Sequence, residues 1–193
     1  MIRTAFVKIF NSQFFLPIFL GVVLLFLYLP YILHGGFIID DWSLMIKEHT
    51  DGGFIFAFKS WFPFFAYRPI APLFLAATAE TFGIYPMGYI ITTLVFWTGA
   101  LTIIGSVFRH YFGNIFTLVF TLLAATPIIA SAVIFSPGMQ LVATVSYFFF
   151  SLSLLCLHKF LRTENKKYYV STYFFALCAL LTYEIVLPFF VVL

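Results

Sequence analysis

Charge is scarce in this sequence. Asp, Glu, Lys and Arg make up only 9% of its 193 residues, whereas 63% are hydrophobic and the mean hydropathy is +1.08. A soluble domain is about 25% charged and about 45–50% apolar. The composition therefore excludes a soluble globular protein and predicts an integral membrane protein. The few bases are scattered rather than gathered in a patch, which argues against a nucleic-acid partner.

Cysteine is also rare. Cys156 and Cys178 lie inside apolar runs without paired spacing, so we interpret them as small buried hydrophobic side chains rather than a disulfide or metal ligands. The four histidines show no metal-ligand spacing. Glu48, His49 and Asp51 lie close together in sequence, but a short acidic loop produces such a group by chance. We predict neither a metal nor another cofactor.

Five apolar segments are long enough to cross a bilayer as helices, which takes about 20 mostly apolar residues. They are residues 14–33, 86–108, 114–135, 138–158 and 169–190. The first follows Arg3 and Lys8 as a signal peptide would, but no small-residue cleavage site comes after it, so it is predicted to be a retained signal anchor. We expect an all-α fold: a polytopic membrane helix bundle of about five transmembrane helices, forming one domain over residues 1–193.

The distribution of bases predicts the orientation of these segments. With the N-terminus in the cytoplasm, five crossings leave only Lys47, Lys59 and Arg68 on the outer side. The other seven of the ten bases are then cytoplasmic: Arg3, Lys8, Arg109, Lys159, Arg162, Lys166 and Lys167. This asymmetry is the one that the positive-inside rule describes.

Residues 34–85 form one long outer loop in this topology. Within it, residues 69–84 are apolar but short and contain two prolines. If they crossed the membrane, Arg109 would move to the outside, so we expect a helix that dips into the outer interface. The loop then carries two short amphipathic helices, and Trp61 and Tyr67 are expected to be interfacial aromatics.

An adjacent acid pair, Asp40-Asp41, opens this loop, which contains five of the seven acidic residues. Ionised carboxylates are costly near a bilayer unless they pair, face water or have a function. A carboxylate here can act as the general base that takes a proton from an attacking hydroxyl. The alternative is that one aspartate caps a short helix beginning at Trp42, although one would suffice for that role.

Arg68, in the sequence Tyr67-Arg68-Pro69, is the single arginine of the outer loop. Arginine binds phosphate bidentately, so Arg68, together with Tyr67, is a candidate for holding the phosphate of a lipid-linked donor. The alternative is an arginine that snorkels to the headgroups and anchors the loop.

Glu184 lies in the outer half of the last apolar run. An acid at membrane depth is a functional-site hypothesis by default, and we expect Glu184 either to pair with Arg68 or to line an acceptor pocket. A structural ion pair that fixes helix packing is the alternative. Glu80 resembles it but is expected at the interface.

Four motifs, taken together, resemble the GT-C superfamily of integral membrane glycosyltransferases, in particular the protein O-mannosyltransferase-like branch that uses polyprenyl-phosphate-linked sugars. They are Asp40-Asp41, Tyr67-Arg68-Pro69-Ile70, the stretch 82–89 leading into a helix that ends near 108–113, and Leu181-Thr182-Tyr183-Glu184 with Leu187-Pro188. In the last motif, Tyr183 stands where that branch has a lysine. The apolar run ends abruptly at Leu193, so we expect the chain to be the N-terminal part of a longer module.

The resemblance implies an inverting sugar transfer from a polyprenyl-phosphate-linked donor to a glycan, lipid or protein of the envelope, at the outer face of a bacterial inner membrane. Asp40 or Asp41 would be the base, Arg68 would lie near the donor phosphate, and no metal would be required. Two other readings stay open. One is a non-enzymatic subunit of a transporter or flippase, and the other is an inactive truncated remnant.

Overall fold

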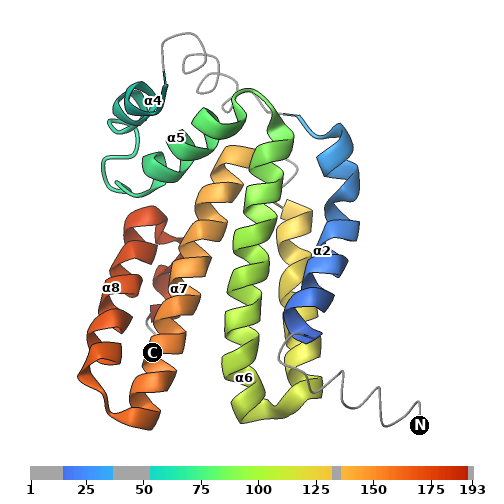
Figure 1. Cartoon of the computed structure of the whole chain (residues 1–193), viewed down its shortest axis with the longest axis vertical. Coiled ribbons are helices and arrows are strands. Elements are labelled where there is room, and N and C mark those ends of the chain that lie inside the picture. The colour runs from blue at the N-terminus through green and yellow to red at the C-terminus, as the bar shows by residue number, and fades with distance from the viewer. Residues whose placement is uncertain (1–14, 37–52, 132–135, 191–193) are drawn as a thin grey trace.

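The computed structural model describes residues 15–36, 53–131 and 136–190, and within these ranges it contains helices and turns but no strand (Figure 1). The helices are α2 (Phe15–His34), α4 (Gly53–Trp61), α5 (Ala71–Phe82), α6 (Pro86–Ser131), α7 (Pro137–Thr163), α8 (Lys166–Thr182), the 3-10 helix η1 (Glu184–Val186) and α9 (Leu187–Phe190). The expected all-α fold class is confirmed.

Three of the described helices are long and apolar enough to cross a membrane: α2, residues 86–125 of α6, and α7. The length and composition of these helices support a membrane protein. The number of five crossings is not confirmed, because two of the expected segments belong to α6 and α8 has only 17 residues.

α2 packs against α6 through one side chain per turn. Leu16, Leu20, Leu24, Tyr28 and Ile32 are all buried, and their spacing of four residues places them on one face of the helix. This stripe contacts apolar side chains of α6 in a shared core. Residues on the opposite face of α2 are exposed, as expected for a helix that meets lipid on one side.

α6 is a helical hairpin rather than one straight helix. Gly113 has a φ of 78° and a ψ of 176°, a conformation that suits glycine and ends the first leg. The two legs touch on either side of it, since the ring centroids of Phe108 and Phe120 lie 4.6 Å apart. At Gly105 the first leg lies close to both the second leg and α2. A Cβ atom there would lie 3.1 Å from Thr121 Cγ2 and 2.5 Å from Leu16 Cδ2 of α2. The expected segments 86–108 and 114–135 thus correspond largely to the two legs.

Replacing Gly105 with leucine should destabilise the bundle, because the added side chain meets α2 and the second leg of α6 at once. Overpacking a core in this way costs about 1–3 kcal/mol. The melting temperature of the detergent-solubilised protein should fall. Gly36→Ala is the matched control, since no described atom lies within 4 Å of a Cβ built there. An equal melting temperature for Gly105→Leu and Gly36→Ala would contradict the packing of the hairpin.

A second hairpin joins α7 to α8. Glu164 adopts the left-handed conformation (φ 54°), and its N–H donates to Phe160 O at 2.7 Å, which closes α7. Asn165 then caps α8 by accepting a hydrogen bond from Lys167 N at 3.0 Å. Ser153 ties the two helices together by donating to Thr172 O at 3.0 Å.

The apolar run at 169–190, expected to be one crossing helix, is interrupted. α8 ends at Thr182, Tyr183 is extended (φ −162°, ψ 127°), and η1 and α9 follow. Ser146 of α7 stabilises this break, since its Oγ lies 2.9 Å from Ala179 O and 3.0 Å from Tyr183 O. Ala179 O also accepts a hydrogen bond from Tyr183 N–H at 3.0 Å, so the buried serine adds a side-chain contact to the backbone bond at the end of α8.

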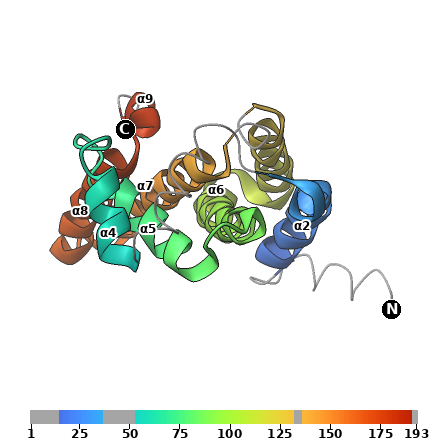
Figure 2. The ribbon, with the colours of Figure 1, turned by 90° about the horizontal axis from the view of Figure 1, so that it is seen from above.

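α4 and α5 lie across one end of the bundle, where α6 begins and α8 ends (Figures 1 and 2). Their apolar faces form a core with the first turn of α6 and the start of α7. Trp61 is only 1% exposed in this core, so the expectation that it is an interfacial aromatic is wrong. Tyr67 is 84% exposed. We call this end of the molecule the α4–α5 end.

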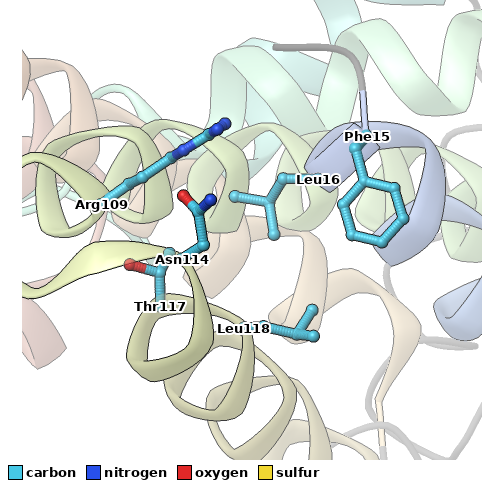
Figure 3. Close-up of a pocket in the computed structure, with 6 residues that line it drawn as sticks. All are labelled: Phe15, Leu16, Arg109, Asn114, Thr117 and Leu118. Carbon is cyan, nitrogen blue, oxygen red and sulfur yellow. The ribbon is translucent and has the colours of Figure 1, made fainter. Parts of the chain in front are cut away.

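The opposite end is formed by the turn at Gly113 and the turn between α7 and α8 (Figure 1). Its described Lys and Arg residues are Arg109, Lys159, Arg162, Lys166 and Lys167, so we call it the basic end. The described bases of the α4–α5 end are Lys59 and Arg68, and its described acids are Glu80 and Glu184. A small pocket of about 20 Å³ also lies at the basic end, between α2 and both legs of α6 (Figure 3).

Candidate functional site

Arg68 and Glu184 form an ion pair at the α4–α5 end, although they are 116 residues apart in the sequence. The Nε of Arg68 donates to one carboxylate oxygen of Glu184 and Nη2 donates to the other. This side-on, bidentate arrangement fixes the plane of the guanidinium group as well as its position. Two of the sequence-derived candidates are therefore in direct contact.

The ring of Tyr183 supports the same guanidinium group. The Cζ atom of Arg68 lies 4.3 Å from the ring centroid, within the range of a cation–π contact. Tyr183 presents its ring here because its extended backbone ends α8. The ion pair and the aromatic face together hold Arg68 from two sides.

The backbone brings the two segments together independently of these side chains. Ile70 N–H donates to Leu181 O at 3.2 Å, which joins the start of α5 to the end of α8. Arg68 N–H donates to Phe65 O at 2.8 Å, and Ala71 N–H donates to Arg68 O at 3.0 Å, so Arg68 lies in a hydrogen-bonded turn. The position of Arg68 is therefore set by the fold as well as by the ion pair.

The pair remains charged and partly open to its surroundings. The hydrogen bonds from Arg68 lower the pKa of the Glu184 carboxyl group, so Glu184 is ionised at neutral pH. The side chain of Arg68 is 21% exposed and that of Glu184 is 53% exposed. A guanidinium group has five N–H donors, and Glu184 engages only the Nε and Nη2 positions. Nη1 of Arg68 has no hydrogen-bond partner among the described residues.

Tyr67 and Glu80 lie outside this cluster. Tyr67 is 84% exposed and makes no hydrogen bond with another described residue. Glu80, near the end of α5, faces the start of α4, where a Cβ atom at Gly53 would lie 3.4 Å from its Oε2. A carboxylate at a helix N-terminus interacts favourably with the helix dipole. Glu80 thus stabilises the beginning of α4 rather than pairing with Arg68.

Asp40 and Asp41 lie outside the described residues, as do Glu48, His49 and Asp51. The segment that contains them is bounded by Gly36 and Gly53. Both ends of this segment are at the α4–α5 end. Gly35, which precedes Gly36, lies close to Ile90 in the first turns of α6, and Gly53 lies close to Glu80. The segment with the acid pair therefore leaves and rejoins the described structure at the end that carries Arg68.

Two residues of the site were missed from the sequence. The sequence marks Tyr183 only as a departure from a family motif, yet its ring contacts the guanidinium group of Arg68. Ser146 was not considered, although it holds the backbone on which Tyr183 and Glu184 are displayed. Tyr183 has a weak sequence signal, an aromatic residue next to an acid within an apolar run, and Ser146 has none.

No protein-family model matches this chain, and neither a curated protein nor a solved structure shows significant similarity to it. The site therefore has to be interpreted from its own chemistry. That chemistry is an arginine oriented by a carboxylate and an aromatic ring at one end of a bundle of apolar helices.

Proposed function

We propose that this chain belongs to a membrane glycosyltransferase that transfers a sugar from a polyprenyl-phosphate-linked donor to an envelope glycan, lipid or protein. The observation that carries this proposal is the position of Arg68. It is held by Glu184 and Tyr183 at the end of the bundle where the Asp40-Asp41 segment begins and ends. The motifs that resemble the GT-C superfamily are the same residues.

The topology of the proposed enzyme has five crossings, made by α2, the two legs of α6, α7 and α8. The abundance of Lys and Arg at the basic end supports placing that end in the cytoplasm of a bacterial cell and the α4–α5 end at the outer face of the inner membrane. A polyprenyl carrier would keep its chain in the bilayer and present its phosphate at the α4–α5 end.

In the proposed reaction, Asp40 or Asp41 takes the proton of an acceptor hydroxyl as its oxygen attacks the anomeric carbon of the sugar. The bond between that carbon and the phosphate oxygen breaks, and the lipid phosphate leaves with the electron pair. Arg68 stabilises the negative charge that develops on this phosphate. Attack from the face opposite the leaving group inverts the anomeric configuration.

The state of Arg68 suits this role. An arginine that is already oriented does not have to be ordered during the reaction, so its interaction with the phosphate favours the transition state at little entropic cost. Glu184 balances its charge when no donor is bound, which lowers the cost of keeping a guanidinium group near the bilayer.

The proposal is tested by reconstituting the full-length protein into vesicles with polyprenyl-phosphate-linked sugars that carry a radiolabel. We expect transfer of the label to an envelope acceptor fraction and release of polyprenyl phosphate. Lys59→Gln, which removes the other described base of the α4–α5 end, should keep this activity. Absence of transfer from every polyprenyl-phosphate-linked sugar would contradict the proposal.

A further inference from the structure

A pocket of about 660 Å³ opens at the basic end, lined by residues of the first leg of α6 and of α7 and by Tyr168 of α8. Its lining includes the apolar side chains of Val107, from the first leg of α6, and Leu155, from α7, which we call the apolar wall. It also includes His158, Lys159 and Arg162 of α7, which we call the basic rim. The lining of the pocket is thus amphipathic.

Neighbouring aromatic residues orient two of the rim groups. The hydroxyl of Tyr111 lies 3.0 Å from Nδ1 of His158, and when Tyr111 donates this hydrogen bond, Nε2–H of His158 remains a donor. The Nζ of Lys159 lies 5.5 Å from the ring centroid of Tyr168, which is in cation–π range. These contacts hold His158 and Lys159 beside Arg162 at the mouth of the pocket.

Among the described residues, no acidic side chain lines this pocket. Glu164, the described acid of the basic end, lines a separate pocket with Lys166 and Tyr169 on the outer side of the turn. The two cations of the rim are therefore not neutralised by a carboxylate inside the pocket. Both lie in the last turns of α7, which is long and apolar enough to cross a membrane, so we expect them at the depth of the lipid headgroups.

We propose that this pocket binds the phosphate of an anionic phospholipid, with the headgroup between Lys159 and Arg162 and the upper acyl chain against Val107 and Leu155. Basic pockets between helices at a membrane surface are suited to anionic headgroups, and arginine can grip phosphate bidentately. The apolar wall favours a lipid over a free phosphate ion, since a free ion would leave that wall in contact with water. The inference is independent of the proposed sugar transfer.

The test measures the affinity of the purified full-length protein for phosphatidylglycerol and for phosphatidylcholine in mixed vesicles. We expect a preference for phosphatidylglycerol that falls about 10-fold or more in the double variant Lys159→Gln/Arg162→Gln, as loss of a charge-assisted hydrogen bond to the phosphate would cause. Lys166→Gln/Lys167→Gln is the matched control, because it removes two charges from the same end outside the pocket. Its affinity should change far less.

Three results would overturn the proposal. They are an equal loss of affinity for phosphatidylglycerol in both double variants, no preference for phosphatidylglycerol in the wild type, or an affinity for inorganic phosphate as high as that for the lipid. The last would assign the pocket to a small phosphate anion. Lys159 and Arg162 are exposed, so their replacement does not open the core. An unchanged melting temperature in phosphatidylcholine alone verifies that the double variant is folded.

Discussion

Replacing Asp40 and Asp41 together by asparagine should reduce sugar transfer by about 100-fold or more, the effect expected for removing a general base. Asparagine keeps nearly the size and hydrogen-bonding capacity of aspartate but cannot accept a proton from the attacking hydroxyl. The measurement is the initial rate of transfer from a saturating lipid-linked donor. Because the substitution removes charge and little volume, donor affinity should change much less than the rate.

The two single variants identify the base. If Asp40→Asn abolishes transfer and Asp41→Asn does not, Asp40 is the base, and the reverse pattern assigns Asp41. Transfer that survives both single changes and the double change would show that the acid pair has another role, such as capping a helix that begins at Trp42. Asparagine caps a helix about as well as aspartate, so a capping role predicts no fall in melting temperature for these variants, but a fall of about 0.5–2 kcal/mol in stability when the capping aspartate is replaced by alanine.

Replacing Arg68 by glutamine should lower transfer on the order of 100-fold, as loss of a preorganised donor to a developing anion does in other enzymes. Arg68→Lys should recover little activity, because an ammonium group cannot reproduce the planar fork held by Glu184 and Tyr183. Glu184→Gln should cause a smaller loss, about 10-fold, since Arg68 keeps its charge but loses part of its orientation.

The Arg68→Gln/Glu184→Gln double variant distinguishes catalysis from packing. If Glu184 acts only by orienting Arg68, the double variant should transfer sugar no more slowly than Arg68→Gln alone, because contacting residues are not additive. Lys59→Gln is the control for loss of one positive charge at the same end. Wild-type rates in Arg68→Gln, with a lowered melting temperature, would leave the ion pair a purely structural role.

Much of the fold follows from composition and periodicity. α2 reads as a membrane helix in the sequence, but it is apolar all round, so which of its residues are buried against α6 was not predicted. The sequence predicts two apolar segments on either side of Gly113, and these segments form the two legs of the hairpin. The positive φ of Gly113 lets the chain turn between the legs within a single residue. The two short helices of residues 34–85 were also expected, and α4 and α5 lie there.

Other features depend on contacts between distant residues and could not be read from the sequence. Trp61 has the composition signal of an interfacial aromatic, but α5, α6 and α7 cover it. The interruption of the last apolar run at Tyr183 depends on Ser146, which lies on another helix. The sequence alone leaves open whether Glu184 pairs with Arg68 or lines a pocket. The fold decides this, because the end of α8 lies beside the start of α5 and brings the two side chains together.

The most direct test of the account is the affinity of the protein for polyprenyl phosphate relative to the uncharged polyprenol, measured for the wild type and for Arg68→Gln in the same membranes. We predict that the wild type prefers polyprenyl phosphate by about 10-fold or more, as a charged hydrogen bond to phosphate provides. We also predict that this preference disappears in Arg68→Gln and persists in Lys59→Gln. A wild-type protein that binds both lipids equally, or a preference that survives in Arg68→Gln, would contradict the assignment of Arg68 to the donor phosphate.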